Sequence, residues 1–177
     1  PISLSKGFLH SSNVYFGTMG QKYLKQDKLE DLANRFLIGK NLKLDFGTVS
    51  SRFYDNNKKK DFSEIQTAWT SIGQNEVRLT IVNAAMLAQT IANDGIMMKP
   101  YAVRSMQTKA QEYKKVTDKE TARKLRSIMK ATGEHYTKQK TGKSTIKAGG
   151  REITIGLKTG TGEIGSDKNN SIWIASM

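Results

Sequence analysis

Two short segments, far apart in the sequence, carry the side chains that could do chemistry. Near the N-terminus, Ser11, Ser12 and Asn13 place two hydroxyls and an amide on consecutive residues. Near the C-terminus, an alternating apolar run, residues 153–157, leads into Lys-Thr-Gly-Thr at 158–161. We expect an edge strand that ends in Lys-Thr-Gly and presents an ammonium, hydroxyls and backbone that a ligand can approach closely. Such a surface suits a carboxylate-bearing acyl substrate.

Each segment also has an ordinary structural interpretation. Ser-Ser-Asn is typical of a helix cap or a turn, because all three side chains bond readily to nearby backbone. Lys158 could be a surface lysine whose stem covers apolar surface, and Thr159 and Thr161 could be plain strand residues. The two motifs together favour chemistry, since S-x-N and K-T-G motifs accompany each other in acyl-serine enzymes.

The pattern resembles the penicillin-binding transpeptidases of the serine β-lactamase and penicillin-binding superfamily. After Ser-Ser-Asn come a β-branched residue, an aromatic residue and Phe, at 14–16, as in that family. An Ile-Gly-Gln segment at 72–74 and the Ala-Asn-Asp-Gly-Ile-Met-Met-Lys-Pro segment at 92–100 resemble class B members. Two departures are Asn75, where Gly is usual, and Ile81, where Pro is common but not required. The resemblance spans Leu9 to Met177.

The resemblance implies an α+β, β-lactamase/transpeptidase-like fold with a helical region and an antiparallel sheet. We expect this fold to be incomplete, with the nucleophile helix and several strands absent. Of five strands, the chain would retain the Lys-Thr-Gly strand and its hairpin partner, joined through residues 165–170. Residues 171–177 have the composition of a buried strand. Residues 1–177 would then form the C-terminal part of one transpeptidase domain.

The third family motif, S-x-x-K, has no convincing match. Three such strings occur, at 3–6, 127–130 and 144–147. The first lies too close to Ser11, the second falls within an expected helix and the third within an expected polar loop. We therefore expect none of them to supply the nucleophile and its base, and we expect this chain alone to be inactive.

The resemblance assigns catalytic roles to Ser11, Asn13 and Lys158. Ser11 would relay a proton to the leaving amine, Asn13 would hold the acyl-side amide, and Lys158 would supply positive potential facing Ser11. The substrate-binding residues would be Thr159 and Thr161, which bond the substrate carboxylate, and Gly160, which lets the substrate lie along the strand. The backbone N–H of Thr161 would be one of two oxyanion donors.

The elements that must position these residues are mostly helical. We expect helices over residues 14–25 and 29–37, a loop-rich connection over 42–60, and a core helix from Ile81 that Thr80 caps and Gly95 closes. A capping box of Thr117 and Glu120 predicts a further helix that ends before Gly133. Residues 138–150 are expected to form a polar loop before the Lys-Thr-Gly strand.

The composition of the chain argues against several classes of function. The 177 residues carry a net charge of +13, but the lysines are scattered and no aromatic stacking array accompanies them, which favours a solvated surface over nucleic-acid binding. The chain has no cysteine and only two histidines, His10 and His135, so we expect neither a metal site nor a cofactor. No apolar run approaches the ~20 residues of a membrane span, so we expect no membrane contact by this chain itself.

The leading hypothesis is part of a peptidoglycan D,D-transpeptidase that binds D-Ala-D-Ala stem peptides and β-lactams. It would act at the extracytoplasmic face of the bacterial membrane, with its anchor outside this chain. Alternatives are a β-lactamase or penicillin sensor of the same superfamily, and a noncatalytic cell-envelope binding module. We also expect self-association through the truncated sheet edge.

Overall fold

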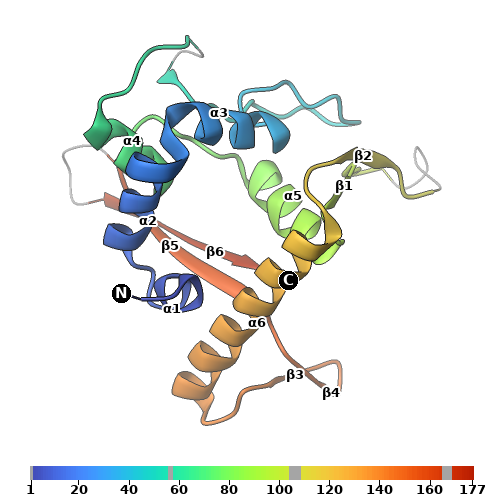
Figure 1. Ribbon diagram of the computed structural model, residues 1–177. Helices are drawn as coiled ribbons and strands as arrows, with labels where there is room; N and C mark the ends of the chain where they lie inside the picture. Colours follow the sequence, from blue (N-terminus) through green and yellow to red (C-terminus); the bar gives the residue numbers. More distant parts are fainter. Residues whose placement is uncertain (1, 56–57, 104–108, 165–168) are drawn as a thin grey trace. The chain divides into compact units, whose positions relative to one another are not determined.

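The computed structural model describes residues 2–55, 58–103, 109–164 and 169–177 (Figure 1). The chain divides into two compact units. The first unit contains residues 1–12, 88–95 and 117–177. The second contains residues 13–87 and 96–116. Helices and short antiparallel strand pairs make the chain α+β, as expected from the sequence.

The second unit is mainly helical. It holds α2 (Asn13–Met19), the π-helix η1 (Gly20–Leu24), α3 (Lys25–Arg35), α4 (Glu64–Ser71) and most of α5 (Ile81–Ala92), with β1 (Ile96–Met98) paired to β2 (Glu112–Lys115). The helices expected over 14–25 and 29–37 are wrong in their bounds. Helical residues run continuously from 13 to 35, so the expected break at residues 26–28 is absent, and the π-helix lies before it at residues 20–24.

Two apolar clusters hold the second unit together. One joins α3 to the loop before α4 through Leu29, Ala33, Phe53 and Tyr54. The other gathers Leu42, Met86, Met97 and Val116, and Met97 is fully buried. Thr80 caps α5 as predicted, since its hydroxyl accepts a hydrogen bond from the Asn83 N–H at 3.1 Å. Because α5 contributes Met86 to the second cluster, this helix is a core element, as the sequence indicated.

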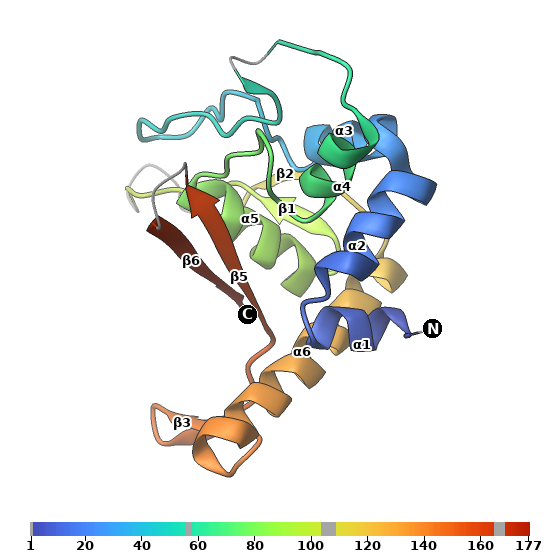
Figure 2. The same ribbon diagram turned by 90° about the vertical axis from the view of Figure 1, so that its left-hand side faces the viewer.

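The first unit is built on α6 (Lys119–Thr141) and a hairpin of β5 (Leu157–Ile164) and β6 (Asn169–Ser176). It also holds α1 (Leu4–Leu9) and a small hairpin of β3 (Ile146–Ala148) and β4 (Arg151–Ile153). Figure 2 shows β5 beside β6, and β3 near the C-terminal end of α6. The predicted connection 165–170 falls mostly on residues 165–168, which lie outside the described residues.

Two predictions about α6 are wrong. Its N-cap is Asp118, whose carboxylate accepts from the Thr121 N–H at 2.7 Å, so the expected capping box of Thr117 and Glu120 does not form. The helix also continues past Gly133 and ends at Gly142, which has a left-handed φ of 76°. Gly133 instead serves packing, because a Cβ there would overlap the carbonyl oxygen of Ile155.

The segment before β5 also differs from expectation. Residues 138–141 belong to α6, and the β3–β4 hairpin occupies most of the expected polar loop. Gly149 and Gly150, with φ of 56° and 77°, form its tight turn, which explains the Gly-Gly pair. The strand predicted to end in Lys-Thr-Gly is interrupted, because residues 154–156 are not in a strand. The Lys-Thr-Gly residues therefore lie near the start of β5 and not at the end of a strand.

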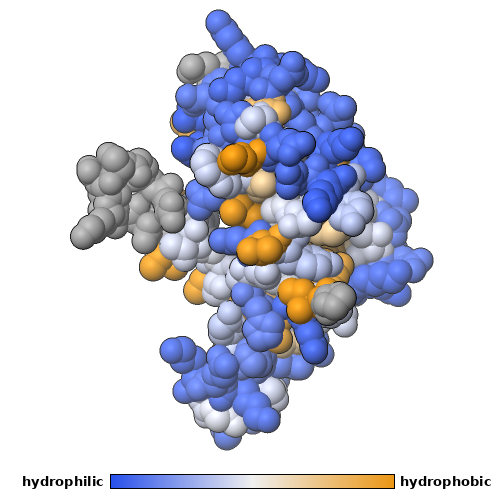
Figure 3. Space-filling view, turned by 60° about the vertical axis from the view of Figure 1, so that its left-hand side comes forward, coloured by the Kyte–Doolittle hydropathy of each residue, from blue (hydrophilic) through white to orange (hydrophobic). Residues whose placement is uncertain are grey.

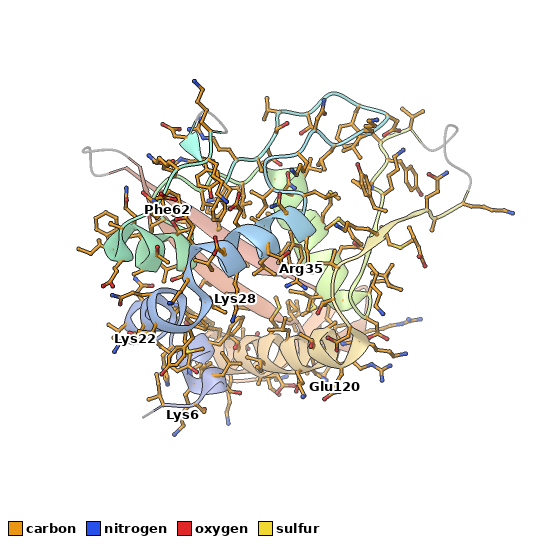
Figure 4. All side chains as sticks on the ribbon, turned by 45° about the horizontal axis from the view of Figure 1, so that its top comes forward. Lys6, Lys22, Lys28, Arg35, Phe62 and Glu120 are labelled. Atoms are coloured by element: carbon orange, nitrogen blue, oxygen red, sulfur yellow. The ribbon has the colours of Figure 1, made fainter. Side chains whose placement is uncertain are left out.

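Both charged and apolar side chains are exposed at the surface. Lys6, Lys22 and Lys28 are exposed (Figure 4). The face in Figure 3 shows hydrophobic residues in separate patches among hydrophilic ones. Among the described residues, no helix combines the length and the apolar composition needed to cross a membrane.

Candidate active site

The C-terminal end of α1 positions Ser11. The Ser12 N–H donates to the Gly7 carbonyl at 2.9 Å, and the Ser11 N–H donates to the Phe8 carbonyl at 3.1 Å. This pair of bonds is a Schellman motif, whose left-handed position usually holds glycine. Ser11 occupies that position with a φ of 49°, an uncommon conformation for a residue with a Cβ. The helix end thus holds an exposed serine hydroxyl in a fixed place.

Packing against α6 positions Lys158 on β5. Gly156 lies just before the strand and is buried, and a Cβ there would lie 3.4 Å from the Lys130 nitrogen on α6. Gly156 and Met177 exchange backbone hydrogen bonds of 3.0 and 2.9 Å, which extends the pairing of β5 with β6. The start of β5 is therefore fixed to both α6 and β6.

The structure brings Ser11 and Lys158 into direct contact across 147 sequence positions. The Lys158 ammonium donates a hydrogen bond to the Ser11 hydroxyl and a second one to the Thr159 carbonyl at 2.6 Å. The Phe8 ring lies near the same ammonium, with its centroid 5.7 Å from Nζ. All these groups belong to the first unit.

The environment of Lys158 changes its acid strength. The side chain is half-buried, and burial lowers the pKa of Lys158 below its ordinary value because it disfavours the charged form. An ammonium with a lowered pKa gives up its proton more readily than a surface lysine. The pair can therefore hold positive charge beside a serine hydroxyl and exchange a proton with it.

The other predicted residues of β5 follow strand alternation. Thr159 and Thr161 share one face of the hairpin and pair with Ile174 and Ile172 of β6. Gly160 pairs with Trp173 on the opposite face, and among the described residues no atom lies within 4 Å of where its Cβ would be. A ligand can therefore reach the backbone at Gly160.

Asn13 belongs to the second unit, where it begins α2 with an exposed side chain. Of the three residues predicted to be catalytic, the structure thus joins Ser11 and Lys158. The convergence of Asn13 with them stays a prediction.

The S-x-x-K serines lie in ordinary structural positions. Ser3 caps α1 by accepting from the Lys6 N–H at 3.3 Å. Ser127 lies within α6, where it lines a shallow depression with Lys119, Glu120, Arg123 and Lys124 that contains none of the predicted site residues. Ser144 lies in the turn between α6 and β3.

Sequence reasoning did not identify Phe8. Its position on the short helix that ends just before the Ser-Ser-Asn motif was the available signal. No group of three or more His, Asp or Glu side chains in the described parts of the chain could hold a metal ion.

Curated relatives of this chain are named as transpeptidases. A Mycolicibacterium smegmatis protein named peptidoglycan D,D-transpeptidase PbpA is 29% identical over 179 residues, which cover 96% of this chain and 34% of that protein. The Mycobacterium tuberculosis protein of the same name is 34% identical over 111 residues, covering 58% of this chain and 21% of that protein. The chain therefore spans about a third or less of these relatives.

Solved structures share the fold. The D,D-transpeptidase domain of a peptidoglycan glycosyltransferase from Eggerthella lenta matches with a TM-score of 0.81 at 24% identity, covering 99% of this chain and 45% of that one. Penicillin-binding protein A from M. tuberculosis, solved as a penicillin G acyl-enzyme complex, matches with a TM-score of 0.67 at 26% identity, covering 94% and 36%.

The resemblance inferred from the motifs is confirmed by the family comparison. The model of the penicillin binding protein transpeptidase domain matches residues 1–177, which is every residue of the chain. The chain therefore belongs to the penicillin-binding protein transpeptidase domain family.

Proposed function

We propose that this chain forms part of the active site of a serine-type peptidoglycan D,D-transpeptidase, which cross-links stem peptides through an acyl-serine intermediate. The observation that carries the proposal is the hydrogen bond from the half-buried Lys158 ammonium to the exposed Ser11 hydroxyl. A lysine held in this way stabilises negative charge that develops on the reacting acyl group. The names of the PbpA relatives support the same reaction.

The roles follow from the chemistry of each group. Ser11 accepts a hydrogen bond from Lys158, so its own proton is available for the leaving amine. Asn13 holds the acyl-side amide of the substrate. Thr159 and Thr161 bond its terminal carboxylate, and the Thr161 N–H is an oxyanion donor. The open approach to Gly160 supports an extended peptide along β5.

The nucleophile and its base come from a segment outside these 177 residues. Ser3 is engaged in capping α1, Ser127 lies on α6 and Ser144 lies in a turn, which supports excluding all three. The parent protein is this chain together with the segment that supplies the nucleophile. The parent acts at the extracytoplasmic face of the bacterial membrane on D-Ala-D-Ala stem peptides, and β-lactams acylate it.

A second part of the proposal concerns self-association. Ile172 and Ile174 on β6 are 79% and 65% exposed, beside the unpaired edge of a two-stranded sheet. Such an edge favours pairing with another chain. We expect light scattering to show dimers of the isolated chain, and a stable monomer with exposed Trp173 would contradict this part.

Acylation by a labelled penicillin tests the function. In the parent, Lys158→Ala should slow acylation by about 10²–10³-fold, because the charge beside the reacting group is lost. Lys143→Ala, in the turn after α6, is the matched control and should leave the rate unchanged. Intact-mass spectrometry of the isolated chain should show no adduct.

The alternatives give different results in the same assay. A β-lactamase would release hydrolysed penicillin with rapid turnover and would not accumulate a stable adduct. A noncatalytic binding module would give no adduct even in the parent. An adduct on Ser3 or Ser127 of the isolated chain would show that an S-x-x-K string is functional.

A further inference from the structure

We propose that Phe8 is a positioning residue for Lys158, and that its aromatic face holds the ammonium against the Ser11 hydroxyl. This inference rests on the proposed function, because it assigns Phe8 a task in the same site. It concerns a residue that neither motif contains.

The first argument is the geometry around the ammonium. Lysine has three N–H donors, and two of those on Lys158 bond the Ser11 hydroxyl and the Thr159 carbonyl. The centroid of the Phe8 ring is 5.7 Å from Nζ, within the range in which the negative face of a ring attracts a cation. Two hydrogen bonds and one ring contact thus hold the ammonium.

The second argument is that Phe8 also holds the partner of Lys158. The Phe8 carbonyl accepts from the Ser11 N–H at 3.1 Å, and this bond is part of the turn that keeps Ser11 left-handed. One residue therefore contacts Lys158 through its side chain and fixes Ser11 through its backbone. A shift of Phe8 would change the distance between the two groups.

The third argument concerns charge. Ionisable side chains occur on both helices packed near Lys158, among them Lys6 and His10 at α1 and Lys130 and Glu134 on α6. The pKa of Lys158 is lowered by burial and not by the charge of any of these groups. In an environment that disfavours the charged form, the Phe8 ring face adds to the two hydrogen bonds that favour it.

A side-chain NMR titration of the isolated chain, labelled on lysine, tests the contact without using activity. Phe8→Leu keeps an apolar side chain but removes the ring face, so the measured pKa of Lys158 should fall by about half a pH unit. Phe8→Tyr keeps the ring and should restore the original value. Phe46→Leu, in a loop of the second unit, is the control and should change nothing.

If Phe8→Leu fails to fold, fluorinated phenylalanines at position 8 replace it. Fluorine weakens the negative face of the ring with little change in shape, so the pKa of Lys158 should fall stepwise with the number of fluorines. A pKa that does not respond to Phe8→Leu or to fluorination would overturn the proposal.

The pH profile of penicillin acylation in the parent is the second measurement. If protonated Lys158 is needed, activity falls as pH rises through its pKa, so Phe8→Leu should move this basic limb to lower pH and Phe8→Tyr should restore it. An unmoved limb together with a shifted NMR pKa would refute the role of Phe8 in the reaction. A different result would contradict the proposed function itself: acylation of the Lys158→Ala parent by penicillin at the normal rate.

Discussion

Two helix ends in the first unit share a left-handed backbone conformation, but their side chains have different roles. At α1, Ser11 is left-handed with a φ of 49°, and the next N–H donates back to Gly7. At α5, Asp94 is left-handed with a φ of 51°, and the Gly95 N–H donates to the Thr90 carbonyl at 2.9 Å. Neither position holds the glycine that this conformation favours.

The side chains explain the difference. The Asp94 carboxylate forms ion pairs with three cations of α6, and Arg123 bonds both of its oxygens at 3.2 Å. The Ser11 hydroxyl is exposed and accepts from one half-buried ammonium. The same backbone strain is thus offset by fold-stabilising contacts at Asp94, whereas at Ser11 it keeps a polar group available to a substrate.

The largest contrast is expected from placing glycine at both positions. Ser11→Gly removes the left-handed strain at the cost of one exposed hydrogen bond, so the free energy of unfolding should rise by about 0.5–1 kcal/mol. Asp94→Gly removes the same strain but also three ion pairs, so it should destabilise the chain. Urea denaturation measures the change in the free energy of unfolding for each variant. Changes of the same sign in the two variants would contradict the proposed difference between the two helix ends.

A smaller effect is the pH dependence at Asp94. Hydrogen bonding from Arg123 lowers the pKa of the Asp94 carboxyl below its usual range, so the carboxylate stabilises the fold above the unfolded-state pKa. This stability is lost as pH falls through the folded-state pKa. Asp94→Asn should therefore be less stable than the original chain at pH 7, and the difference should vanish in acid.

The control for this titration is Asp31→Asn on α3. That carboxylate makes a single exposed i, i+4 pair with Arg35 at 3.2 Å, so the substitution should change stability little at any pH. A difference for Asp94→Asn that persists unchanged below pH 3 would mean that the ion pairs are not its cause.

The smallest effect is expected at Asn75. This residue stands where the family usually has glycine, and its φ is 63°, which asparagine tolerates better than most residues. Its side chain also donates to the Thr70 hydroxyl at 3.1 Å. Asn75→Gly should change the free energy of unfolding by only a few tenths of a kcal/mol. A loss above about 1 kcal/mol would show that the side-chain bond matters more than the backbone conformation.

The sequence predicted the parts of the fold that depend on local signals. The cap at Thr80 and the core helix α5 follow from capping residues and helical spacing. The pairing of the Lys-Thr-Gly strand with the next one came from the family resemblance, and the structure confirms it. The α+β class and the family followed from the order of motifs. The proximity of Ser11 to Lys158 came from the same resemblance and from no local pattern.

The wrong predictions depend on tertiary packing. Gly133 looked like a helix end, but a long-range contact with the Ile155 backbone requires a small residue within α6. The capping box was misplaced by one residue, since Asp118 competes with Thr117 for the same role. Phe8 was missed because its partner, Lys158, is 150 residues away.

The rate of acylation of the Ser11→Gly parent by a labelled penicillin tests the central claim most directly. The Ser11 hydroxyl is proposed to act in the reaction, so this variant should be acylated about 10²-fold more slowly even though its fold is more stable. Loss of folding cannot explain that combination. An unchanged acylation rate in the Ser11→Gly parent would contradict the assignment of the Ser11–Lys158 pair to the active site.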